Sequence, residues 1–178
     1  MPIRIMVLIT LLFSVFLQDE ELVWQKERLL TWSDFKAPAQ RHSPAAAVTA
    51  SGLTYNYVLN QVNGKITGFD ATVLAHFYPE HSWCKEDEIT DHILSHEQFH
   101  FNITELHARL LRKALTRLKP NPKLDAQIRQ AYRKVNKDLD AMQRDYDNET
   151  SYSRNYESQE AWEKKVNFHI NLLDAYKL

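Results

Sequence analysis

Hydrophobic and polar residues alternate along residues 51–60. The apolar members occupy every second position and are Leu53, Tyr55, Tyr57 and Leu59. Such alternation is typical of a strand with one buried face. Asn63 and Gly64 follow, a pair typical of a two-residue type I′ turn, and residues 66–78 are rich in β-branched and aromatic side chains. The pattern therefore predicts an antiparallel β-hairpin in the first half of the chain.

After residue 86 the spacing of the apolar residues changes to three and four. With Ile89 as the origin of a helical wheel, the residues within about 40° of one line are Ile93, His96, His100, Ile103, His107 and Leu111. Acidic residues are frequent before residue 92 and basic residues between 109 and 119, a distribution that the helix dipole favours. Pro120 and Pro122 cannot continue a helix. We therefore predict one long helix over residues 86–118.

Two more amphipathic segments follow the prolines. Residues 123–146 carry apolar side chains three and four positions apart, namely Leu124, Ile128, Tyr132, Val135, Leu139 and Met142. A polar stretch, residues 147–155, separates them from a third segment, marked by Trp162, Val166, Ile170, Leu173 and Tyr176. Because the strands precede the helices, the order is typical of an α+β fold. We expect a hairpin or small antiparallel sheet, then a long helix, then two further helices.

The strongest chemical signal is the segment His96-Glu97-Gln98-Phe99-His100. Two imidazoles four residues apart share one face of a helix, and zinc hydrolases bind their metal through such a pair. Glu97 falls about 80° from the line of the histidines, where it can act on a water molecule beside the metal. A single histidine on an apolar stripe is more often a hydrogen-bonded core residue. The pair with its glutamate instead favours a zinc site with ligands His96 and His100 and with Glu97 as the catalytic base.

The composition limits the partners of the chain. With 178 residues, 44% of them hydrophobic, the chain is long enough to bury the core of one compact domain. A formal net charge of −1 argues against nucleic acid as a partner, because binding to phosphates needs a surplus of basic residues. Cys84 is the only cysteine, so no intramolecular disulfide can form. The pattern favours no particular oligomeric state.

The first residues have the organisation of a secretory leader. Arg4 precedes an apolar run, residues 5–17, that is too short to span a bilayer comfortably. We predict a signal peptide over residues 1–17 and a single domain over residues 18–178, secreted or periplasmic and not inserted in the membrane. Small residues are missing at the usual cleavage positions, so an anchor formed by the uncleaved segment is the alternative.

Several blocks of the sequence together resemble a known family. They are residues 30–35 (LTWSDF), 45–52 (AAAVTASG) and 82–83 (SW), residues 96–101 (HEQFHF) with Glu105 and Arg109, and residues 146–150 (YDNET). This combination resembles the bacterial domain of unknown function 922, a family described as secreted zinc-dependent proteases. The resemblance spans nearly the whole mature chain. It implies a zincin-like metallopeptidase fold and a secreted or periplasmic setting, and it implies no particular substrate.

The chain departs from the family pattern at one position that bears on the metal. After the YDNET block the family usually carries a histidine followed by a small residue, whereas Tyr152 and Ser153 stand here. A catalytic zinc normally has three protein ligands and one open position, so another side chain must complete the set. The acidic or phenolic candidates cluster where the second helix ends and are Asp145, Asp147, Glu149 and Tyr152, with His76, His81 and His92 as further alternatives. We favour Glu149 as the third ligand.

The predicted function is hydrolysis of peptide bonds in a polypeptide substrate. Zinc would activate a water molecule, and Glu97 would accept its proton and pass it to the leaving amine. Tyr152 is either a hydrogen-bond donor to the developing oxyanion or a packed loop residue. The segment 71–77 is a candidate edge for pairing with an extended substrate, or an ordinary strand. The alternative function is that of a secreted binding or scaffold protein with a zincin fold and weakened catalysis, because Tyr152 replaces the expected histidine.

Overall fold

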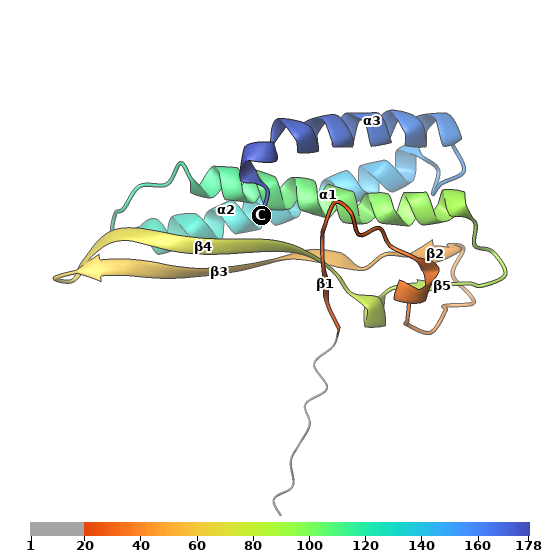
Figure 1. Ribbon diagram of the computed structural model, residues 1–178, viewed down its shortest axis with the longest axis horizontal. Helices are drawn as coiled ribbons and strands as arrows, with labels where there is room; N and C mark the ends of the chain where they lie inside the picture. Colours follow the sequence, from red (N-terminus) through yellow and green to blue (C-terminus); the bar gives the residue numbers. More distant parts are fainter. Residues whose placement is uncertain (1–19) are drawn as a thin grey trace, which may run out of the picture.

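A sheet and three helices form stacked layers in the computed structural model, which describes residues 20–178 (Figure 1). The signal peptide predicted over residues 1–17 lies outside the described residues. Helices α1 (Asp91–Leu115) and α2 (Leu124–Glu149) cover one face of a long hairpin, and α3 (Tyr156–Leu172) packs on α1 and α2. The fold is therefore α+β, as the order of strands and helices predicted.

The hairpin consists of β3 (Ser51–Val62) and β4 (Lys65–Phe77). Asn63 and Gly64 both have positive φ, 50° and 73°, as a type I′ turn requires. Leu53 pairs with Ala75 across the strands, and both side chains are buried against the helices. The predicted hairpin, its turn and its buried face are thus confirmed. A third, two-residue strand, β1 (Leu22–Val23), pairs with the end of β4.

A second, smaller sheet was not predicted from the sequence. It pairs β2 (Ala47–Val48) with β5 (Trp83–Cys84) in antiparallel register, close to the amino-terminal end of α1 (Figure 1). Two short 3₁₀ helices, Trp32–Asp34 and Pro79–His81, lie in the loops around it. Strands of two residues are too short to show an alternating pattern, so the sequence contained no periodic signal for them.

Helix α1 begins five residues later than the pattern predicted. Thr90 has extended backbone angles, and its side-chain oxygen accepts a hydrogen bond from the N–H of Ile93 at 3.2 Å. This contact is a helix cap. The preceding acidic residues form a separate turn, in which the N–H of Glu88 donates to the carbonyl of Lys85 at 2.9 Å. The cap at Thr90 therefore determines where α1 begins.

Helix α2 runs three residues beyond its predicted end, so residues 147–149 are helical and do not belong to a loop. The hydroxyl of Thr150 donates to the carbonyl of Tyr146 at 2.7 Å and closes the last turn. The third segment forms α3 as predicted, capped by Asn155 and followed by a 3₁₀ turn, Asp174–Tyr176. No helix among residues 20–178 is long and apolar enough to cross a membrane.

Buried ion pairs fix the carboxyl half of α1 to the elements around it. Arg109 donates to Glu105 at 2.8 Å and to the carbonyl of Ile170 at 3.0 Å. Arg112 donates to the carbonyl of Val73 in β4 at 2.8 Å. The ion pair of Glu105 and Arg109 is therefore an internal anchor, since both side chains are at most 5% exposed. These contacts hold the carboxyl half of α1 against β4 and the end of α3.

Candidate metal centre

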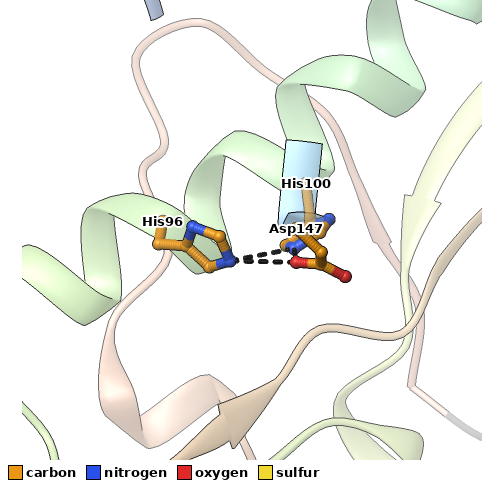
Figure 2. A group of neighbouring side chains, drawn as sticks. All are labelled: His96, His100 and Asp147. Atoms are coloured by element: carbon orange, nitrogen blue, oxygen red, sulfur yellow. Dashed lines mark hydrogen bonds and ion pairs between the residues drawn. The ribbon is translucent and has the colours of Figure 1, made fainter. Parts of the chain in front are cut away.

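The amino-terminal half of α1 presents two histidines on one buried face. His96 and His100 are one turn apart, and their Nε2 atoms lie 3.2 Å from each other. His96 is 4% exposed, and the side chain of His100 is 11% exposed. The predicted phase of the pair is confirmed, because both rings point to the same place between α1 and α2 (Figure 2).

The carboxylate of Asp147, from the last turn of α2, completes the group. Its Oδ1 atom lies 2.9 Å from Nε2 of His100 and 3.2 Å from Nε2 of His96 (Figure 2). A tetrahedral ion with bonds of about 2.0–2.1 Å separates neighbouring ligand atoms by about 3.3–3.4 Å. The three donor atoms form a slightly smaller triangle, with sides of 2.9 to 3.2 Å, and two imidazole nitrogens with one carboxylate oxygen are a donor set that zinc accepts. The residues present therefore fit a divalent metal ion.

Gln143 determines which ring nitrogen of His100 carries the proton. Its Oε1 atom, which can only accept, contacts Nδ1 of His100, while its Nε2 atom donates to the backbone carbonyl of the same histidine at 2.9 Å. Nδ1 must therefore carry the hydrogen in the neutral ring. When His100 binds a metal ion as a neutral ring, its lone pair is then on Nε2, the atom that otherwise donates to Asp147. Metal-binding histidines are usually oriented by such a contact.

Charge around the group favours an ionised aspartate and a cation. Burial tends to raise the pKa of Asp147, but hydrogen bonds from His100 and His96 and their charge hold that pKa well below its usual range. Burial lowers the pKa of His100, and Asp147 and Glu97 more than offset this, so the net direction is upward. The negative end of the α2 dipole also lies here. The negative charge of Asp147 and Glu97 and the helix dipole thus favour binding of a cation at the site.

Glu97 lies beside the histidines at the wall of a pocket of about 360 Å³. The pocket is lined by His96, Glu97, His100 and Asp147 from the helices, and by residues 44–49 and 152–154 from the loops. Glu97 is 5% exposed, and its Oε2 atom has no hydrogen-bond partner among the residues described. Its backbone carbonyl accepts from the hydroxyl of Thr49 at 3.2 Å. A buried carboxylate oxygen without a partner is suited to receive a proton from a molecule in the pocket.

Comparison with known families adds one finding. The model of a family described as "Bacterial protein of unknown function (DUF922)" matches residues 27–154. The chain belongs to this family. No curated protein and no solved structure matches it. The DUF922 segment contains all four residues of the centre, His96, Glu97, His100 and Asp147, and ends before α3.

The structure brings Asp147 to the histidines, whereas Glu149, the favoured third ligand, faces α3. The Oε2 atom of Glu149 accepts a hydrogen bond from the indole of Trp162 at 2.8 Å. Two residues along a helix correspond to a rotation of about 200°, so Asp147 and Glu149 cannot point the same way once α2 continues through them. The extension of α2 beyond residue 146 is therefore the reason for the difference.

A signal for Asp147 was present in the sequence. Gln143, Tyr146, Asp147 and Thr150 continue the spacing of three and four beyond Leu139, and all four side chains contact α1 or close the last turn. These residues are polar or amphipathic, so apolar periodicity alone does not extend the predicted helix to them. The polar continuation of the stripe is therefore a signal that α2 extends to Asp147.

Tyr152 lies at the rim of the pocket and is 55% exposed. Together with Ser151 and Ser153 it has a positive φ, and its N–H donates to the carbonyl of Asp147 at 2.8 Å. Three successive non-glycine residues with positive φ are unusual and are held in this conformation by their surroundings.

Two of the alternative histidines lie outside the triad of His96, His100 and Asp147. His76 contacts Thr54, and His92 contacts the carbonyl of Ser153.

The strand next to the pocket is β2, and not the segment 71–77 considered from the sequence. Ala47 and Val48 line the pocket. The segment 71–77 pairs with β3 along one edge, and on the other edge Val73 accepts from Arg112 and Ala75 accepts from Trp24. These contacts occupy the edge that the sequence suggested for a substrate.

Proposed function

We propose that the protein is a zinc-dependent peptidase of the zincin type, acting in a secreted or periplasmic setting. The observation that carries the proposal is the convergence of His96, His100 and Asp147, with the unpartnered carboxylate of Glu97 beside them in an open pocket. The donor triangle fits zinc, and a general base at this place serves hydrolysis.

Each residue then has a defined task. When bound, zinc acts as a Lewis acid that makes water more acidic and polarises a carbonyl group. Glu97 accepts a proton from the water that adds to the peptide carbonyl, and it gives this proton to the amine nitrogen as the C–N bond breaks. Gln143 keeps the lone pair of His100 on Nε2. The second proton of the water leaves the new carboxyl group for the amine, so the products are one carboxylate and one ammonium group, and atoms and protons balance.

An extended polypeptide is the proposed substrate. The N–H of Lys85 donates to the carbonyl of Ala46 at 2.8 Å, so residues 46 and 48 direct their backbone groups towards β5. Backbone groups alternate in direction along a strand, and those of Ala47 therefore face away from β5. Ala47 lines the pocket with 5% of its surface exposed, and this edge of β2 is the proposed place where an extended substrate approaches.

Metal content and catalysis are tested separately. We expect about one zinc per chain in wild-type protein, loss of this zinc in His96→Ala, and full zinc in His169→Ala, because His169 is exposed and distant on α3. Elemental analysis after loading and desalting gives the ratio. Absence of zinc from the loaded wild type would overturn the proposal.

Glu97→Gln removes the base and keeps the size of the side chain. We expect this variant to retain zinc and to cleave an unfolded protein substrate at least 100-fold more slowly than wild type, as general-base catalysis typically contributes this much. Equal rates would reject Glu97 as the base. Zinc in both proteins with cleavage in neither would favour the secreted binding protein over the peptidase.

A further inference from the structure

Tyr146 is a buried residue that packs against both histidines of the candidate metal centre. It is 0% exposed and lies one residue before Asp147 in the last turn of α2. Its ring stacks on that of His96, with centroids 4.6 Å apart and planes 17° apart. It meets the ring of His100 edge-on, with centroids 5.1 Å apart and planes at 75°. One aromatic ring thus contacts both histidines of the triad.

The two histidines differ in their other support. His100 is oriented through its Nδ1 atom by Gln143. The Nδ1 atom of His96 is buried and has no hydrogen-bond partner within residues 20–178. A metal-binding histidine usually gives this second nitrogen to a carboxylate, a carbonyl or water, which fixes the plane of the ring. For His96 the stacked contact with the Tyr146 ring takes the place of such a hydrogen bond.

We propose that Tyr146 is a positioning residue that holds the rings of His96 and His100 so that their Nε2 atoms converge with Asp147. This inference rests on the metal site proposed above. Stacking restricts rotation of the His96 ring about its Cβ–Cγ bond, and the edge contact limits His100 in a second direction. A loss of this restriction spreads the donor atoms and weakens metal binding without removing a ligand.

The hydroxyl group of Tyr146 has no part in this role. It is buried and makes no hydrogen bond to any described residue. The ring of Tyr146, and not its hydroxyl group, makes the contacts with His96 and His100. Phenylalanine should therefore replace tyrosine without loss.

Helix α3 supports the ring from behind. Trp162 meets Tyr146 edge-on, with centroids 5.7 Å apart and planes at 62°, and its indole N–H donates to Glu149 at 2.8 Å. Trp162 thereby contacts two residues of the α2 turn that carries Asp147. The ring of Tyr146 contacts both Trp162 and His96, so α3 contributes to the site although it lies beyond the segment that the family model matches.

Three variants test the role of the ring. Tyr146→Leu removes the aromatic face, Tyr146→Phe keeps it, and Phe101→Leu removes a buried ring from the same core. Phe101 packs on Phe77, at the side of α1 that faces the sheet, with centroids 5.8 Å apart. Affinity for zinc is measured by calorimetric titration of metal-free protein, and the visible spectrum of the cobalt(II) form reports the geometry of the ligands.

We expect Tyr146→Leu to bind zinc roughly 10- to 100-fold more weakly than wild type and to show an altered cobalt spectrum. Tyr146→Phe and Phe101→Leu should match wild type in both readouts, although Phe101→Leu melts at a lower temperature. If wild type binds zinc and Tyr146→Leu binds it equally well, the positioning role is wrong and the metal site stands. If Tyr146→Phe loses as much as Tyr146→Leu, the hydroxyl and not the ring is responsible. A wild type that does not bind zinc rejects the proposed function itself.

Discussion

At the scale of single residues, the centre depends on which nitrogen of each histidine keeps its lone pair. For His100 this is decided by one amide, since Gln143 can only accept at Oε1 and its Nε2 is already committed to a backbone carbonyl. A side chain with no acceptor would leave both ring nitrogens free to carry the proton. The state with the proton on Nε2 cannot bind a metal ion at that atom.

This gives a prediction for Gln143. Gln143→Leu should weaken zinc binding roughly 10- to 100-fold, because the tautomer and the plane of the ring are no longer fixed. Gln143→Glu keeps an acceptor at the same place and should bind zinc about as well as wild type. Competition with a chromophoric chelator measures both affinities. The explanation fails if the leucine variant competes as strongly as wild type does.

At the scale of elements, a short 3₁₀ helix secures the loop that lies against α1. Asp34 accepts from Arg28 at 2.9 and 2.6 Å and from the N–H of Thr31 at 2.7 Å, and it is 8% exposed. The neighbouring N–H of Leu30 donates to the side chain of Gln98, within the HEQFH segment, at 2.7 Å. The WSDF block thus stabilises a turn that contacts α1, the helix that carries His96 and His100.

The contribution of Asp34 to stability should depend on pH. Burial tends to raise the pKa of Asp34, but the hydrogen bonds from Arg28 and Thr31 lower it below its ordinary value. A depressed pKa in the folded state means that the stabilisation is present above the unfolded pKa, about 3.9, and is lost as the pH falls through the folded value. Asp34→Asn should therefore cost about 1–3 kcal/mol at pH 7, and less at pH 3.

Urea unfolding of wild type and variant at both pH values measures this difference. Glu27→Gln, which changes an exposed carboxylate in the same loop, is the control and should differ little from wild type at either pH. A loss at pH 3 as large as that at pH 7 would show that the ionised form of Asp34 is not what stabilises the turn.

At the scale of the whole molecule, the sequence predicted those parts that repeat with a period. The hairpin, α1 and α3 carry runs of ten residues or more, so their buried faces were evident. The sheet of β2 and β5 depends on contacts between segments far apart in the chain, and no local pattern encodes it. Likewise His96 and Glu97 could be identified from one helix, whereas Asp147 required knowing where α2 ends and how it packs on α1.

Because the proposed ligands come from two helices, bound metal should stabilise the entire domain. His96 and His100 belong to α1 and Asp147 to α2, so an ion held by all three joins the two helices that cover the hairpin. A ligand at 100 times its dissociation constant stabilises the folded state by about 2.7 kcal/mol. For a domain of this size that corresponds to a rise of roughly 5–10 °C in Tm.

Asp147→Asn should lose most of this rise, because the neutral amide is a poorer ligand, whereas Asp145→Asn, at an exposed position in the same turn, should keep it. Calorimetric melting with zinc and again after a chelator measures the shift, and an equal rise in the Asp147→Asn protein would show that Asp147 does not hold the metal.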